Sequence, residues 1–179
     1  KRYGRRTVLE GLDASVPRGA VTALVGPNSA GKTTLLKLLL GLARPDAGRI
    51  VVDGEVIGTD PRYRAAIGYM PQIVRFPGQL TGRELLEAIR VLRRDRAALD
   101  LRMADALGLG DDFDRPLGVL SGGTRQKINA VLALAFRPRI LVLDEPPAGL
   151  DPLASRVLKD RLVEERAAGT TVLITTHVL

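Results

Sequence analysis

Short apolar segments recur near both ends of the chain, and each stops at a glycine or a polar residue. Val21–Gly26 is a β-branched apolar segment that ends at a Gly-rich loop, and Ile140–Asp144 is an apolar segment that ends in an acid. Thr170–His177 has a similar character. We predict strands for all three, and also for the glycine-bounded segment Gly48–Gly54 and for Ala65–Gln72.

Helical spacing replaces this pattern in the middle of the chain. Thr81 and Glu84 form a T-x-x-E capping box, which predicts the start of a helix. Four apolar residues behind the box are expected to share one buried face: Leu85, Leu86, Ile89 and Leu92. Ala98–Gly110 is predicted to be a further helix that stops at a glycine. After Ser121, apolar residues at helical spacing predict a helix as far as Ala135.

Two more helices are predicted beside the terminal strands. Gly31–Leu42 follows the Gly-rich loop at the end of the first strand, and its leucines indicate a buried helix. Asp151 and Pro152 suit the N-cap and first turn of a helix that runs to Ala168, and Gly169 suits its end.

This order of elements predicts an α/β fold. Alternation of apolar strands with helices indicates a mostly parallel sheet that is flanked by helices. We expect one domain over residues 1–179, with an α/β core formed by residues 1–78 and 137–179. Residues 79–136 are predicted to be an inserted helical subdomain. Because the chain starts and stops abruptly, we expect a fragment that is truncated at both ends.

Composition narrows the choice of function only a little. There are no cysteines, which excludes disulfide frameworks and Cys-ligated metals. No apolar segment approaches the roughly 18 residues that cross a bilayer, so we expect no membrane span. The net charge of +7 fits either a solvated Arg-rich surface or a surface that faces lipid headgroups, nucleic acid or another acidic partner.

The segment Gly26–Thr34, "GPNSAGKTT", carries the strongest chemical signal. It fits G-x-x-x-x-G-K-[ST] without a mismatch and lies between a predicted strand and a predicted helix, as in P-loop nucleotide sites. Backbone N–H groups and the helix N-terminus favour phosphate oxygens there. Lys32 is expected to reach the β- and γ-phosphates, and the Thr33 hydroxyl to bind Mg²⁺. The candidate nucleotide-binding residues here are Gly26, Pro27, Asn28, Ser29, Ala30, Gly31, Lys32, Thr33 and Thr34.

Two acids and the single histidine supply candidate chemistry for a nucleoside triphosphate. Asp144 ends an apolar strand, where ligands bind in open α/β sheets, and can hold the metal through water. Glu145 is expected to orient or deprotonate the attacking water. His177 follows a predicted core strand at the same edge, where it is either structural or a hydrogen-bond donor to the γ-phosphate.

A second Gly-rich helix start occurs at Leu120–Lys127, "LSGGTRQK". One nucleotide site needs only one phosphate-binding loop, so this segment calls for a different explanation. Together with the other motifs it resembles a known family, the ATPase subunits of ATP-binding-cassette (ABC) transporters. The resemblance covers nearly the whole chain, and the motifs occur in the expected order.

The resemblance implies roles for further residues. Gln72 in "YMPQ" is similar to the Q-loop glutamine, a catalytic and metal-sensing residue, and Tyr3 is similar to the aromatic that stacks on adenine. "ILVLDE" resembles the Walker B strand with its catalytic glutamate, and His177 resembles the switch histidine. Asp151 resembles the D-loop aspartate. The signature positions are Ser121, Gly122 and Gly123. The chain departs from the family pattern at Thr124, where glutamine is usual, and at Pro147, where threonine is usual.

The resemblance also implies partners and cofactors. We expect ATP and Mg²⁺ as ligands, and a head-to-tail dimer in which each ATP lies between one copy's P-loop and the other copy's signature. A transmembrane permease is the second expected partner, with the ATPase at the cytoplasmic face of the membrane and no direct contact with nucleic acid. "LSGGTRQK" and "FPGQLTGRELL" most resemble the polyketide- and multidrug-type exporter ATPases, and they also resemble the copper and nitrous-oxide-reductase maturation ATPase. The alternative is a soluble ABC ATPase that acts on DNA or the ribosome. An adenylate-type kinase is disfavoured because it needs no signature motif.

Overall fold

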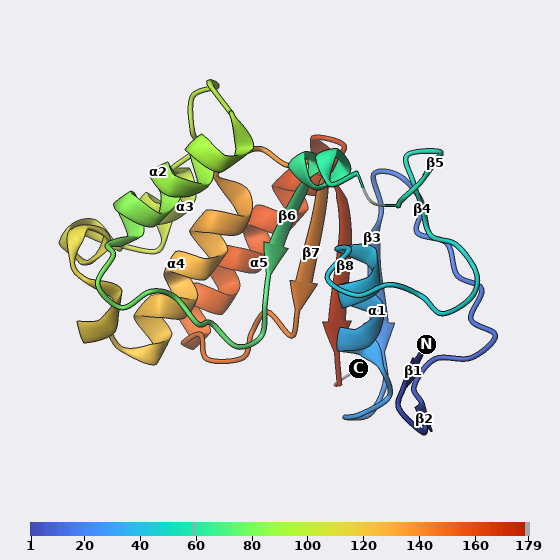
Figure 1. The fold of residues 1–179 in the computed structure, drawn as a ribbon. Coiled ribbons are helices and arrows are strands. Elements are labelled where there is room, and N and C mark those ends of the chain that lie inside the picture. The colour runs from blue at the N-terminus through green and yellow to red at the C-terminus, as the bar shows by residue number, and fades with distance from the viewer. Residues whose placement is uncertain (59, 178–179) are drawn as a thin grey trace.

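The computed structural model describes residues 1–58 and 60–177, and its centre is a parallel sheet of four strands (Figure 1). The strands are β3 (Val21–Val25), β8 (Thr171–Thr176), β7 (Ile140–Asp144) and β6 (Ile67–Met70), and they neighbour one another in that order. All three pairings are parallel. The carboxyl ends of the strands therefore meet at one edge, and the predicted α/β class is confirmed.

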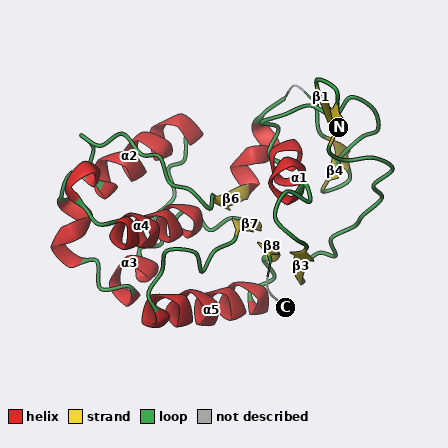
Figure 2. Ribbon diagram, turned by 90° about the horizontal axis from the view of Figure 1, so that it is seen from below, coloured by secondary structure: helices red, strands yellow, loops and turns green. Residues whose placement is uncertain are grey.

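Helices cover both faces of this sheet (Figure 2). Helix α1 (Lys32–Leu39) lies on one face, whereas α4 (Gly122–Leu134) and α5 (Pro152–Ala167) lie on the other. Successive side chains of a strand point to opposite faces. Accordingly, Val142 of β7 belongs to the apolar cluster of α1, and its neighbours Leu141 and Leu143 belong to the larger cluster of α4 and α5.

The predicted helix caps are present at α2 (Gly82–Arg93) and α5. The Thr81 hydroxyl accepts from the backbone N–H of Glu84, and the Glu84 carboxylate accepts from the backbone N–H of Thr81, which completes the capping box. The Asp151 carboxylate accepts from the N–H of Ala154 at the start of α5. These local patterns were therefore sufficient to place both helix starts.

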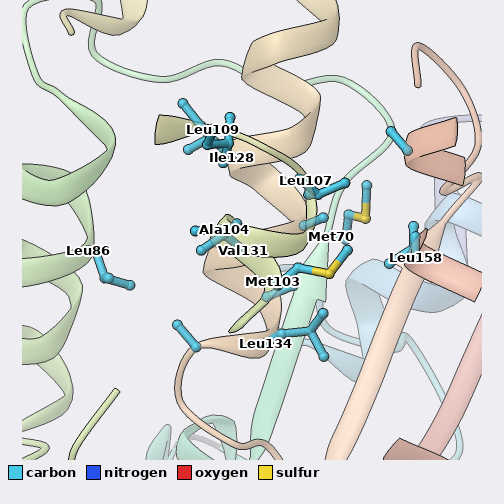
Figure 3. Packing of buried hydrophobic residues seen from close by; sticks show 14 of the residues in the cluster. Met70, Leu86, Met103, Ala104, Leu107, Leu109, Ile128, Val131, Leu134 and Leu158 are labelled. Atoms are coloured by element: carbon cyan, nitrogen blue, oxygen red, sulfur yellow. The ribbon is translucent and has the colours of Figure 1, made fainter. Parts of the chain in front are cut away.

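The helices of the middle segment share one apolar core with the sheet (Figure 3). This core takes one or more residues from each of several elements: Leu86 from α2, Met103 from α3 (Arg102–Ala106), Val131 from α4, Met70 from β6 and Leu158 from α5. Short 3₁₀ turns complete the middle segment and the approach to β6: η1 (Arg62–Ala66), η2 (Gly110–Asp114) and η3 (Leu117–Val119). The division into a core of residues 1–78 and 137–179 and a helical subdomain of residues 79–136 stays a prediction.

Two small hairpins lie outside the main sheet. One pairs β1 (Arg2–Tyr3) with β2 (Arg6–Thr7), and the other pairs β4 (Val51–Val52) with β5 (Glu55–Val56). The prediction of one strand over Gly48–Gly54 was wrong in its extent, since the strand β4 in this segment is limited to Val51–Val52. Asp53 and Gly54 both have positive φ, 54° and 87°, so they form the two-residue turn of the second hairpin instead of extended backbone.

The predicted helix over Ala98–Gly110 was also wrong in its length, since α3 has only five residues. The Asp100 carboxylate accepts from the backbone N–H and the guanidinium of Arg102 and from Arg161 of α5. These bonds fix Asp100 ahead of the helix, whose N-cap is Leu101, so the helix begins only at Arg102. At the other end, Gly108 has φ 62°, which α-helical backbone does not permit.

One residue assigned to the buried face of α2 is exposed: 82% of Leu92 is accessible to solvent. Arg93 occupies the position on the buried face that was expected for Leu92, because it lies two turns after the buried Leu86 on the same side of the helix. Its guanidinium lies 4.7 Å from the centre of the Phe136 ring and donates to the carbonyl of Ala65. A long basic side chain thus covers apolar surface where a leucine was expected.

Candidate functional site

The loop between β3 and α1 borders a cavity of about 440 Å³. Ser29 and Gly31 have positive φ, 67° and 95°, which turns this stretch of backbone around the cavity. A Cβ at Gly31 would lie 2.9 Å from the side chain of Leu9 and 3.2 Å from the carbonyl oxygen of Val8, so a larger residue at this positive φ would be strained. The cavity is lined by Arg6, Val8, Asn28, Ser29, Ala30, Gly31, Lys32, Thr33, Thr34, Gln72 and Glu145.

Lys32 is buried at the bottom of this loop. Its ammonium group donates to the carbonyl oxygens of Gly26 at 2.6 Å and Pro27 at 3.1 Å, and it lies 3.7 Å from a Glu145 carboxylate oxygen. Gly26 and Pro27 are not among the residues that line the cavity; they hold the lysine through their carbonyl groups. The positive charge is therefore fixed between the loop and the strand-end acids.

Asp144 joins the loop to the sheet. Its buried carboxylate accepts from the Thr33 hydroxyl at 3.1 Å and from the Thr175 hydroxyl at 2.5 Å. The Thr175 hydroxyl in turn accepts from the backbone N–H of Glu145 at 3.0 Å. Sequence reasoning missed Thr175, although a threonine near the carboxyl end of an apolar strand was an available signal.

Glu145 is the point at which the predicted catalytic side chains meet. The Gln72 amide donates to one of its carboxylate oxygens at 3.1 Å, and His177 Nδ1 lies 3.0 Å from the same oxygen. The backbone of Glu145 has φ 49°, a conformation that non-glycine residues rarely adopt. Such strain concentrates at functional sites, where surrounding structure maintains it. Here the bonds from its N–H to the carbonyl and the hydroxyl of Thr175 hold it.

The electrostatic influence of Asp144 extends to Tyr69 on the neighbouring strand β6. Burial, with a smaller contribution from the negative charge of Asp144, raises the pKa of Tyr69 to about 12. The phenol is therefore neutral at physiological pH. This strand contributes no further charge beside the acids.

Tyr3, like Gly26 and Pro27, is not among the residues that line the cavity. It lies on β1 with 49% of its surface exposed, and the Lys1 ammonium is 5.3 Å from the centre of its ring. Its proposed stacking role stays a prediction. Arg6 and Val8 line the cavity instead, and no motif in the sequence marked either of them.

The second Gly-rich segment forms the start of α4, and none of its residues lines the cavity. The Ser121 hydroxyl accepts from the backbone N–H of Thr124 at 3.0 Å and shares a hydrogen bond with the Thr124 hydroxyl at 2.8 Å. Asp151, at the start of α5, forms an ion pair with Lys127 of α4 at 3.0 Å. The signature helix and the D-loop candidate are thus in contact through this ion pair, and Asp151, like the signature residues, does not line the cavity.

A parallel sheet with a G-x-x-x-x-G-K-T loop after one strand and an acid pair after another defines a P-loop nucleoside-triphosphate-binding domain. The particular family follows from comparison: the family model described as ABC transporter matches residues 9–148. The chain belongs to this family. The expected class, the ATPase component of an ABC transporter, is confirmed.

Two named relatives are similar in sequence to the whole of this chain. It is 41% identical over 184 residues to the Nod factor export ATP-binding protein I of Ralstonia nicotianae, covering all of this chain and 57% of that protein. It is 40% identical to the daunorubicin resistance ATP-binding protein DrrA3 of Streptomyces coeruleorubidus, of which it covers 58%. The chain therefore spans less than two thirds of the length of these relatives.

Solved structures agree with this assignment. The structure of an ATP binding subunit of an ABC transporter has a TM-score of 0.83 and 32% identity, and the match covers 99% of this chain and 76% of that one. A dimeric bacterial ABC transporter cassette has a TM-score of 0.84 at 24% identity, over 96% and 80% of the two chains, and supports the fold alone. Within residues 1–58 and 60–177, no helix has the length and apolar character needed to cross a bilayer.

Proposed function

We propose that this chain hydrolyses ATP as the energy-converting subunit of an exporter. The observation that carries the proposal is the convergence of Gln72, His177 and Lys32 on the carboxylate of Glu145, beside the P-loop cavity. A carboxylate that is fixed by three polar neighbours at a phosphate-binding loop suits the activation of water for phosphoryl transfer.

The site fits Mg²⁺ as well as nucleotide. Thr33 and Asp144 place a hydroxyl and a carboxylate oxygen 3.1 Å apart, and Mg²⁺ prefers such hard oxygen ligands. The described residues hold no cluster of three or more His, Cys, Asp and Glu side chains that would bind a metal without help. Phosphate oxygens and water would complete the shell, with Gln72 as a further oxygen donor. Bound there, the metal would neutralise charge on the β- and γ-phosphates.

The residues around the cavity then have separate roles in binding the nucleotide and in hydrolysis. Lys32 and the loop N–H groups of residues 28–34 hold the phosphates, and Tyr3 is proposed to stack on the adenine. Glu145 orients the attacking water and accepts its proton, while Gln72 and His177 fix the direction of the carboxylate. His177 is also placed to donate toward the γ-phosphate once nucleotide separates it from Glu145.

The signature segment is proposed to act on the nucleotide of a second copy. Ser121, Gly122 and Gly123 present a hydroxyl and the N-terminus of a 13-residue helix, and both favour an anion. Their absence from the lining of their own cavity supports this arrangement, since they have no phosphate to bind within one chain. The neighbouring Asp151 would lie at the same interface.

Export is supported by the names of the relatives. Both the Nod factor and the daunorubicin proteins are named for export or resistance, which favours an exporter. A transmembrane permease is the implied partner, and the cytoplasmic face of the membrane is the implied location. Neither relative supports an action on DNA or the ribosome. Co-purification of the full-length protein from membranes, with identification of its partner, tests this part of the proposal.

The catalytic part is tested with the full-length protein and the variant Glu145→Gln, which keeps the shape of the side chain. We expect Mg²⁺-dependent ATP hydrolysis by the wild type and a loss of roughly a hundredfold or more in kcat for the variant, because the general base is removed. ATP binding should be retained. Equal hydrolysis by both proteins would contradict the assignment of Glu145.

A further inference from the structure

The segment that carries Gln72 has little backbone support of its own. Gln72 follows strand β6 by two residues, and its side chain is exposed, with the bond to Glu145 as its contact. Among the described residues, no backbone–backbone hydrogen bond involves residues 71–76. Some other group must therefore fix the backbone if the Gln72 amide is to stay at 3.1 Å from the Glu145 carboxylate.

That group is an amide pair on the inner face of α4. The Asn129 side chain, 2% exposed, donates to the carbonyl oxygen of Pro71 at 2.9 Å. The same nitrogen lies 3.3 Å from the Oε1 of Gln126, which is 4% exposed. Pro71 is the residue directly before Gln72, so the bond from Asn129 anchors the backbone one peptide unit from the Gln72 side chain.

The amide pair is incompletely hydrogen-bonded, which favours a positioning role over a contribution to stability. The Gln126 Nε2 atom is buried and has no hydrogen-bond partner within the described part of the chain. A buried donor without a partner is destabilising, and two apolar residues would serve the core better. Reversing the Gln126 amide would not help, because two NH₂ groups would then face each other.

Helix α4 itself is fixed firmly enough to act as a support. A Cβ at Gly68 of β6 would lie 2.0 Å from the carbonyl oxygen of Ala133, so the helix backbone lies directly against the strand. The same helix carries Ser121 at its N-cap, about two turns before Asn129. One rigid element thus connects the signature residues to the support of Gln72.

We propose that Asn129, oriented by Gln126, is a positioning residue that holds Gln72 against Glu145. Through α4 it ties the geometry of the chain's own catalytic carboxylate to the signature segment that faces the second copy. The inference rests on the proposed function, because Gln72 and Glu145 are assigned to hydrolysis there. It adds two residues outside the motifs, and both act through Gln72 without touching nucleotide.

A double-mutant cycle in the full-length protein tests the proposal, with kcat and KM for ATP measured for Asn129→Leu, Gln72→Ala and the double variant. Asn129→Leu should lower kcat at least about tenfold, since a displacement of about 1 Å at a catalytic group costs up to about a hundredfold. KM should change less than about twofold. In the Gln72→Ala background, Asn129→Leu should have no further effect.

A matched control on the same helix is Val131→Ala, a buried apolar residue that does not bond to the Q-loop. It should lower the melting temperature with little change in kcat. If Asn129→Leu does not fold, Gln126→Leu enters the same cycle. That substitution removes the acceptor that orients Asn129 together with the unpartnered Nε2, and leaves the bond from Asn129 to Pro71 possible. Its smaller loss of kcat should likewise vanish when Gln72 is alanine.

The outcomes separate the two proposals. Multiplicative losses in the double variant, or an unchanged kcat in Asn129→Leu alongside a reduced kcat in Gln72→Ala, would overturn the positioning role and leave the ATPase assignment intact. A wild-type protein that does not hydrolyse ATP, or one that is indifferent to Glu145→Gln, would overturn the proposed function and this inference with it.

Discussion

The hydroxyl of Thr33 and the carboxylate of Asp144 are hydrogen-bonded at 3.1 Å although 111 residues separate them in the chain. This contact joins the P-loop helix to the end of the central strand and defines the proposed metal position. Asp144→Asn should therefore retain the fold and lower Mg²⁺-dependent hydrolysis by roughly a hundredfold, the order of effect expected when one electrostatic stabiliser is lost.

The measurement for Asp144 is a Mg²⁺ titration of ATP hydrolysis, together with ADP binding with and without Mg²⁺. In the wild type, Mg²⁺ should tighten nucleotide binding, and in the variant this difference should shrink. An exposed acid, Asp111→Asn, serves as the control and should behave like wild type. Wild-type Mg²⁺ dependence in Asp144→Asn would contradict the metal assignment.

The close approach of α4 to β6 predicts a large effect of a single methyl group. In Gly68→Ala, the new Cβ would lie 2.0 Å from the Ala133 carbonyl oxygen and 2.8 Å from the Pro138 ring, so the helix must move. Overpacking of this kind should lower the free energy of unfolding by about 3 kcal/mol. Urea unfolding measures it, with Gly58→Ala as the control because its Cβ meets open space. Equal midpoints for the two variants would contradict this packing.

Asp100 predicts a specific acid sensitivity. Hydrogen bonds from Arg102, and then from Arg161, hold the pKa of Asp100 well below its usual range, although burial opposes the shift. The folded protein keeps the carboxylate ionised where the unfolded chain takes up a proton. The resulting stability is therefore present above about pH 4 and falls as the pH drops below that value toward the folded-state pKa.

The corresponding measurement is the free energy of unfolding between about pH 6 and pH 2 for the wild type and Asp100→Asn. At neutral pH the variant should lose about 3 kcal/mol, because Arg161 loses one buried partner and keeps Glu165. Toward low pH the two curves should converge, since the wild type loses the same contribution by protonation. Parallel curves would show that Asp100 is not responsible for the acid sensitivity.

The residues that the sequence placed correctly are those whose signal is local. The P-loop, the acid pair after β7 and the caps at Thr81 and Asp151 each depend on a few neighbouring residues. The Asp-Gly pair at the β4–β5 turn was equally local and was overlooked. The failures over Ala98–Gly110 and at Leu92 have a different cause.

Contacts between distant segments contributed at both positions. Asp100 is held by Arg161, 61 residues away, as well as by the nearby Arg102. Arg93, which occupies the position expected for Leu92, donates to the carbonyl of Ala65, 28 residues away. The bond between Asn129 and Pro71 spans 58 residues and joins two segments that carry separate motifs. The candidate site residues were thus chosen from local motifs and their roles stay predictions, whereas the contacts that connect them required the fold.

Each nucleotide site is proposed to take its P-loop from one copy and its signature from the other. Mixing two full-length variants, Lys32→Ala and Ser121→Arg, tests this most directly, because each should be nearly inactive alone. Random pairing gives half heterodimers, each with one intact composite site, so the mixture should regain about a quarter of wild-type hydrolysis. A mixture that stays as inactive as its components would contradict the shared site.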